Sequence, residues 1–187
     1  MKDSEKVTHS VGCACCADVP GGRIDRRRLI QLAAGGLVLA ASPGPVLAAT
    51  GHYEAMILTC IDPRFVDPVH NYARRRGLTG KYSQFAIAGA AIGALHPAFK
   101  DWHKAFWDNL ATSVELHHIK KIIAIDHRDC GAAKIAYGEA KVANRALETA
   151  THREALAQFR QQVGKRQPKL VVETGLMALS GRIEMLA

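Results

Sequence analysis

Short apolar runs alternate with longer segments of helical spacing along most of this chain, and this alternation constrains the fold more than any other feature. Four runs read as strands, 55–60, 82–88, 122–125 and 170–172, and the first of them reads as a buried strand. Three segments between them have helical periodicity: 66–76, 105–119 and 143–163. Strands that alternate with helices of this length are typical of α/β proteins. We therefore predict an α/β fold with a mainly parallel four-stranded sheet flanked by helices.

The end of the chain predicts one more piece of the sheet. Residues 176–186 form a last apolar run that contains the turn pair Ser180-Gly181. A turn inside such a run indicates a strand or hairpin rather than a helix. We expect an additional C-terminal edge strand.

Length and charge exclude several classes of protein. The chain has 187 residues, of which 48% are hydrophobic, so it has enough apolar material for one folded domain and is not a disordered protein. Its formal net charge is +8. Only one short arginine cluster, 74–76, lies outside the N-terminal segment, and no long basic run or basic–aromatic alternation occurs. Nucleic-acid binding is therefore not predicted.

The first 48 residues have the pattern of a targeting segment. Arg26, Arg27 and Arg28 directly precede the apolar run 29–41, which is shorter than the roughly 20 residues that a bilayer-spanning helix needs. The helix-breaking segment 42–45 follows. We predict that 1–48 is a twin-arginine-type signal peptide cleaved after Ala48. The protein would then be periplasmic and would keep no stable membrane anchor.

Two points about this segment stay open. The apolar run 29–41 could instead be a buried helix of the domain. Three of the five cysteines, Cys13, Cys15 and Cys16, lie in the segment and would be lost with it. The mature domain, 49–187, keeps Cys60 and Cys130.

Two predicted strands end in residues that carry chemistry. The first is followed by Cys60, Asp62 and Arg64, and the third by His127 and Cys130. Because ligands of open parallel sheets bind beyond the carboxyl ends of the strands, these side chains are expected to meet. Two thiolates and one imidazole are zinc ligands, and three protein ligands with one open position are typical of catalytic zinc. The alternative is a Cys60–Cys130 disulfide, the default for two cysteines in an exported protein.

This pair of motifs, Cys-x-Asp-x-Arg and His-x-x-Cys-Gly, resembles the β-class carbonic anhydrases from about residue 55 to 186. The resemblance implies that Cys60, His127 and Cys130 hold Zn²⁺. It also implies that Asp62 and Arg64 form a catalytic carboxylate–guanidinium dyad. The implied reaction is the reversible hydration of carbon dioxide to bicarbonate and a proton through a zinc-bound hydroxide. The family also implies a homodimer or a higher homo-oligomer.

Elementary chemistry gives the dyad a role. Arg64 can hold Asp62 ionised with a bidentate hydrogen-bonded pair and keep it off the metal. Asp62 can then accept a hydrogen bond from the hydroxide and orient it. Small residues after the second strand, Ala88, Gly89 and Ala90, fit either a pocket for a small apolar gas or tight helix–sheet packing.

The sequence also departs from the family. Residues 86–89 lack the polar pair of the family's Arg-Asn-Ala-Gly stretch, and Cys60 and His127 are unusually far apart. We place the extra residues in 95–108, expected as a surface loop with incidental His96 and His103 and with Trp102 and Trp107. The alternative is that this insertion lines the mouth of the pocket and that its histidines relay protons. These departures leave two alternatives. One is hydrolysis of carbonyl sulfide or carbon disulfide, and the other is a non-catalytic zinc-binding or redox-responsive protein.

Overall fold

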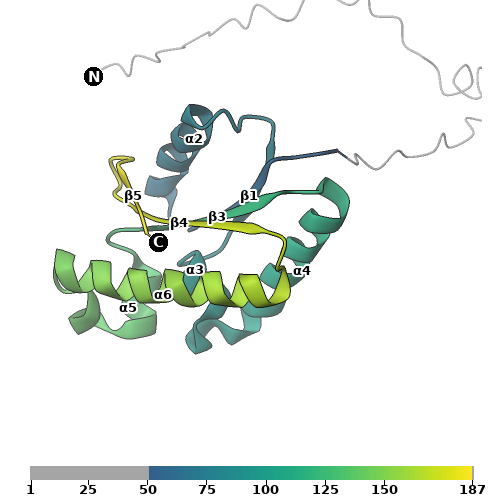
Figure 1. Ribbon diagram of the computed structural model, residues 1–187. Coiled ribbons are helices and arrows are strands. Elements are labelled where there is room, and N and C mark those ends of the chain that lie inside the picture. Colours follow the sequence, from purple (N-terminus) through teal and green to yellow (C-terminus); the bar gives the residue numbers. More distant parts are fainter. Residues whose placement is uncertain (1–50, 187) are drawn as a thin grey trace, which may run out of the picture. The chain divides into compact units, whose positions relative to one another are not determined.

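A mixed five-stranded sheet forms the centre of the computed structural model, which describes residues 51–186 (Figure 1). The strands lie in the order β2-β1-β3-β4-β5. Their bounds are β1 Ala55–Thr59, β2 Tyr82–Ala86, β3 Lys121–His127, β4 Val171–Met177 and β5 Ile183–Met185. The first four strands are parallel and β5 is antiparallel to β4. The predicted four-stranded parallel sheet and its C-terminal edge strand are confirmed.

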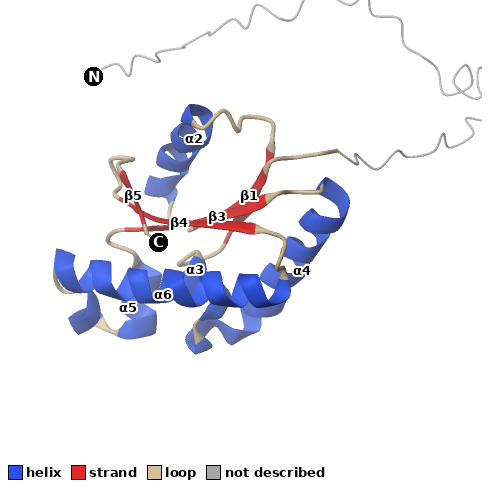
Figure 2. Ribbon diagram, in the orientation of Figure 1, coloured by secondary structure: helices blue, strands red, loops and turns tan. Residues whose placement is uncertain are grey.

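Helices cover both faces of the sheet (Figure 2). Their bounds are α2 Val66–Arg75, α3 Ala91–Leu95, α4 Lys100–His117, α5 Gly131–Tyr137 and α6 Arg145–Arg166. Three 3₁₀ turns join them: Pro63–Phe65, Pro97–Phe99 and Glu139–Val142. Helix α2 lies on one side of the sheet, and α3, α4, α5 and α6 lie on the other.

The central strands are buried on both faces, as parallel strands between two helical layers must be. Successive side chains of a strand point to opposite faces. Ile57 of β1 packs in the same apolar cluster as Val69 of α2. Its neighbour Leu58 packs in the other cluster, with Leu110 of α4 and Leu156 of α6. This two-sided core explains why β1 and β3 are almost continuously apolar in the sequence.

One local prediction was wrong, and two further local features differ from what the sequence indicated. The segment 95–108 is not a surface loop, because α4 begins at Lys100, well before the expected start at 105. The first turns of α4 have mostly solvated residues, and the buried Phe99 and Phe106 anchor them to the core. The short helices α3 and α5 were not predicted. Strand β4 continues to Met177, so the start of the run 176–186 belongs to β4.

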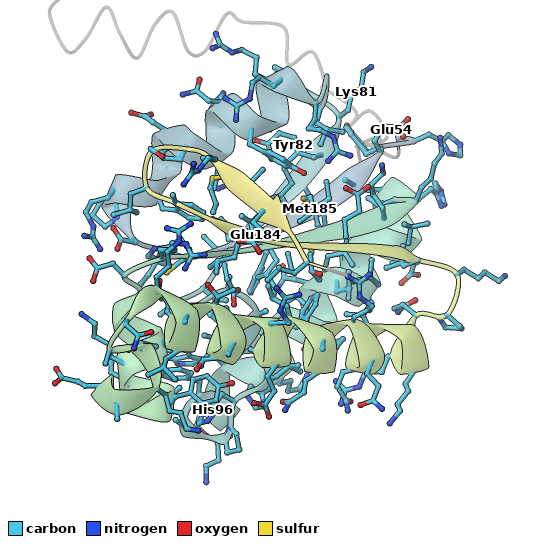
Figure 3. The ribbon with its side chains drawn as sticks, turned by 60° about the vertical axis from the view of Figure 1, so that its left-hand side comes forward. Glu54, Lys81, Tyr82, His96, Glu184 and Met185 are labelled. Carbon is cyan, nitrogen blue, oxygen red and sulfur yellow. The ribbon has the colours of Figure 1, made fainter. Side chains whose placement is uncertain are left out.

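The two edges of the sheet differ in what they carry. Strand β5, with the labelled Glu184 and Met185 in Figure 3, forms one edge, and β2, with Tyr82, forms the other.

The predicted signal peptide and its cysteines lie outside the described residues. Between residues 51 and 186, no helix has both the length and the apolarity needed to cross a membrane.

The pairing of β1 with β3 brings the two motifs together. Thr59, the last residue of β1, is level with Ile125 of β3. Cys60 follows directly, and β3 continues to His127 beside it. Both motifs therefore leave the sheet at its carboxyl edge, next to each other.

Candidate metal centre

Three buried donor side chains meet at this edge of the sheet. One ligand atom from each of Cys60, His127 and Cys130 lies within 4.8 Å of the other two. Cys60 follows β1, His127 ends β3, and Cys130 directly precedes α5. Both cysteines are free thiols, so no disulfide joins them. The structure brings together the three residues that the sequence selected as ligands.

The ring of His127 is oriented for coordination. Its Nδ1 donates a hydrogen bond to the backbone oxygen of Arg128, at 2.9 Å. The ring also packs against Phe65 in a tilted arrangement, with 4.7 Å between the ring centroids. Nε2 is therefore a bare acceptor, and it is buried without a hydrogen-bond partner. A buried nitrogen of this kind, fixed by a hydrogen bond on its other side, is what a metal-binding histidine presents.

The Cys60 sulfur accepts hydrogen bonds that favour its deprotonated form. The pKa of its thiol is lowered to about 4, first because Cys130 donates a hydrogen bond to its sulfur. The backbone N–H of Gly89 also donates to Cys60 Sγ, at 3.2 Å. The shared proton raises the pKa of Cys130, whose burial acts in the same direction. Cysteine binds a metal as a thiolate, so a lowered thiol pKa favours metal binding. Two sulfur donors and one imidazole suit a borderline cation such as Zn²⁺.

Asp62 and Arg64 form the expected pair next to the donor cluster. Arg64 donates from Nε to Asp62 Oδ1, at 3.0 Å, and from Nη2 to Asp62 Oδ2, at 2.7 Å. This hydrogen bonding lowers the pKa of Asp62 to about 2. Asp62 Oδ2 is 3.9 Å from His127 Nε2, so the carboxylate borders the metal centre.

A second carboxylate, not apparent from the sequence, also binds Arg64. Asp129 Oδ2 accepts from Arg64 Nη1 at 3.0 Å, and Lys134 donates to the other oxygen of Asp129, at 3.2 Å. Asp129 lies between the two ligands of its motif and has a positive φ of 57°. Arginine offers five donors, so a partner beyond Asp62 could have been sought among the charged residues of the second motif.

The three small residues after β2 have different roles. Ala88 lines an open pocket of about 350 Å³ together with mainly apolar side chains, including Ile61 and Trp102. Gly89 and Ala90 serve packing, and the backbone N–H of Gly89 also donates to Cys60 Sγ. A Cβ on Gly89 would lie 2.9 Å from the Cβ of Ala132, and Ala90 is fully buried.

The histidines of 95–108 lie outside the donor cluster. His96 Nδ1 accepts a hydrogen bond from the backbone N–H of Ala98, at 3.2 Å. His103 Nε2 is 3.1 Å from the backbone oxygen of His96. They stabilise the start of α4. In the part of the chain that the structure describes, only Cys60, His127 and Cys130 form a group of three potential ligands.

Comparison with known proteins agrees with this geometry. Residues 50–173 match the family model described as "Putative carbonic anhydrase". The chain belongs to this family. Uncharacterised proteins of Rickettsia conorii and Rickettsia bellii are each 31% identical to it over 133 residues. That match covers 71% of this chain and 72% and 81% of theirs.

Solved carbonic anhydrases share the fold. The β-carbonic anhydrase CafA of Aspergillus fumigatus superposes with a TM-score of 0.50 at 16% identity, over 76% of this chain and 79% of its own. The Coccomyxa β-carbonic anhydrase, solved with acetazolamide, gives 0.50 at 17% identity, over 75% and 74%. The chain is therefore a carbonic anhydrase family member with a β-carbonic-anhydrase-like fold.

Proposed function

We propose that this protein is an exported zinc enzyme that interconverts carbon dioxide and bicarbonate. The observation that carries the proposal is the buried, unpartnered Nε2 of His127. It lies with two cysteine sulfurs inside 4.8 Å and beside a carboxylate held by Arg64. Cys60, His127 and Cys130 would hold the metal. Three protein ligands leave a fourth position for water or substrate.

The chemistry divides between the metal and the dyad. A zinc ion bound there would lower the pKa of a coordinated water to about 7, which makes hydroxide available near neutral pH. Asp62 stays ionised at all working pH values, because its pKa is about 2. Its role is to accept a hydrogen bond from the attacking oxygen and orient it. Two carboxylates raise the pKa of Arg64 above its usual value, so the guanidinium stays protonated and remains a hydrogen-bond donor.

One apolar pocket is a candidate for holding the substrate. The pocket lined by Ala88 and Trp102 also includes Ile61, which directly follows Cys60. Ile61 is 60% exposed, although it is apolar. Carbon dioxide carries no charge, so a pocket of this composition can admit it without a charged clamp.

Metal analysis joined to stopped-flow hydration of carbon dioxide tests the proposal. One zinc per chain together with turnover that disappears on metal removal supports it. Turnover of carbonyl sulfide or carbon disulfide without hydration of carbon dioxide would replace it with the hydrolase alternative. Bound zinc with no turnover of any of the three gases would make the protein a non-catalytic zinc-binding homologue.

We also propose that the protein works in the periplasm as a homodimer or a larger homo-oligomer. Strand β2 supports assembly, because it pairs only with β1 among the described strands and so offers a free edge. Light scattering on the purified protein tests this, and a monomer at micromolar concentration would contradict it.

A further inference from the structure

One buried polar pair is not used by the proposed mechanism. Asp126 lies on β3 and is 2% exposed, and His152 lies on α6 and is completely buried. Asp126 Oδ2 accepts a hydrogen bond from His152 Nδ1, at 2.8 Å. In β3 the carboxylate follows the four apolar residues 122–125 and directly precedes His127. A buried carboxylate is costly unless it is well hydrogen-bonded, and such a group calls for a reason.

The second oxygen of Asp126 holds the start of α3. Asp126 Oδ1 accepts from the backbone N–H of Ala91, at 3.0 Å. Ala91 follows the tight turn that joins β2 to α3, in which Ala90 N–H donates to the oxygen of Ile87, at 2.9 Å. In the same turn, Gly89 N–H donates to Cys60 Sγ. Two sets of hydrogen bonds, joined by the backbone of the turn, thus connect α6 through Asp126 to a metal-centre sulfur.

This turn has a conformation that it would not keep unaided. Ala90 has φ 48° and ψ −111°, in a region that alanine rarely adopts, and Gly89 also has a positive φ, of 80°. Strained residues of this kind persist only where their surroundings fix them from several sides. Here the Cys60 sulfur fixes the turn at Gly89, and the Asp126 carboxylate fixes it at Ala91.

We propose that Asp126 is a positioning residue for the metal centre. It holds the Gly89–Ala91 turn so that the Gly89 N–H points at Cys60 Sγ, and His152 fixes the carboxylate in the orientation this requires. The inference rests on the proposed function only in taking Cys60 as a metal ligand. It does not involve the Asp62–Arg64 dyad, and Asp126 is not proposed to contact the substrate.

The proposal implies that the Gly89 hydrogen bond sets how strongly the Cys60 thiolate donates electrons to a bound metal. A hydrogen bond from a backbone N–H to a ligating sulfur withdraws electron density from it. Loss of that bond raises the energy of the sulfur lone pairs and lowers the energy of thiolate-to-metal charge transfer. Groups that orient a metal ligand typically change metal affinity by about 10- to 100-fold when they are removed.

The experiment uses the full-length protein with Co²⁺ in place of zinc. Asp126→Ala is expected to shift the thiolate-to-cobalt absorption band to lower energy and to weaken zinc binding about 10-fold in a chelator competition. Leu110→Ala is the matched control, because it removes buried side-chain atoms from the core cluster that also holds Ala90 and Ala91, but Leu110 makes none of the hydrogen bonds that hold the turn. Asp126→Asn keeps an oxygen acceptor for Ala91 N–H, so its shift is expected to be smaller than that of the alanine variant.

A rescue variant separates positioning from general loss of stability. Glycine adopts the Ala90 conformation without strain, so Ala90→Gly added to Asp126→Ala is expected to recover most of the band position and affinity. If Asp126→Ala does not fold, the same comparison is made with Asp126→Asn. A spectrum and an affinity that match wild type, or that change as much in Leu110→Ala, would overturn the proposal, as would a complete lack of rescue.

A metal-free readout keeps this inference separate from the proposed function. Amide hydrogen exchange at Gly89 and Ala91 in the apoprotein is expected to be at least about 10-fold faster in Asp126→Ala than in Leu110→Ala. If the wild-type protein binds neither zinc nor cobalt, the proposed function fails. The exchange rates then decide whether Asp126 holds the turn, and equal rates in the two variants would refute it.

Discussion

Arg64 donates hydrogen bonds to both oxygens of Asp62, with Nε 3.0 Å from Oδ1 and Nη2 2.7 Å from Oδ2. The backbone N–H of Arg64 donates to Oδ1 as well, at 2.9 Å, so the carboxylate also caps the 3₁₀ turn that begins at Pro63. Nη1 is meanwhile engaged by Asp129. The carboxylate is thus fixed at the border of the metal centre by one side chain that is itself held at two points.

The bidentate hydrogen bonding of Arg64 to Asp62 should be needed for turnover but not for metal binding. We expect Arg64→Ala to keep its zinc and to lose at least about 10-fold in kcat/KM, equivalent to roughly 1.4 kcal/mol of transition-state stabilisation. Without its partner, Asp62 can move onto the metal. Arg64→Lys keeps the charge but not the bidentate fork, so its loss should be intermediate. The measurements are zinc stoichiometry and stopped-flow hydration, and full activity in Arg64→Ala would remove the dyad from the mechanism.

Loss of any one donor should empty the metal centre. We expect Cys60→Ser, His127→Ala and Cys130→Ser each to reduce zinc content sharply and to lower the melting temperature, since metal binding contributes to folding free energy. His103→Ala, outside the donor cluster, is the control and should keep its zinc. Unchanged zinc content in all three donor variants would show that the metal binds elsewhere.

The sequence predicted the centre of the fold and the donor set because both depend on local patterns. Buried parallel strands are nearly continuous apolar runs, and a strand end fixes where its next residues point. Cys60 and His127 could therefore be placed together before their distance was known. The roles of Asp129 and Asp126 could not, because each depends on partners far away in the chain, Arg64 and His152.

The missed helices have a related cause. Helix α3 has five residues and α5 has seven, which is too short for helical periodicity to show. The first turns of α4 have mostly solvated residues, so its start could not be distinguished from a loop. In each case the burial of a few side chains against the sheet, and not the local pattern, decides the helix.

Glu173 should give the fold a specific acid dependence. Its carboxylate on β4 is half-buried, which would raise its pKa, but hydrogen bonds from Lys121 and Arg76 outweigh this and lower the pKa below its usual 4.5. A folded-state pKa below the unfolded one stabilises the protein above about pH 4.5, and this contribution is lost as the pH falls further. We expect Glu173→Gln to flatten the unfolding free energy below pH 4.5 in denaturant titrations. Glu115→Gln, an exposed carboxylate on α4, is the control.

Gly89 should tolerate no side chain. Gly89→Ala would place its Cβ 2.9 Å from that of Ala132 and would also carry the strain of a positive φ. Gly77→Ala is the matched control, with a φ of +66° but no atom within 4 Å of the added Cβ. We expect the control to lose about 1–2 kcal/mol of unfolding free energy and Gly89→Ala to lose more and to bind zinc more weakly. Equal losses in stability with unchanged zinc affinity would contradict this.

The predicted export signal can be tested with charge held constant. Replacing Arg26, Arg27 and Arg28 together by lysine keeps the positive charge but removes the guanidinium groups that a twin-arginine signal presents. We expect the variant to stay uncleaved in the cytoplasm, whereas the wild-type protein should be recovered from the periplasm with its first residue at Ala49. Arg74→Lys with Arg75→Lys, in the folded domain, makes the same chemical change outside the signal and should be exported normally. Cell fractionation with mass spectrometry of the N-terminus gives the answer, and normal periplasmic delivery of the triple variant would refute the twin-arginine assignment.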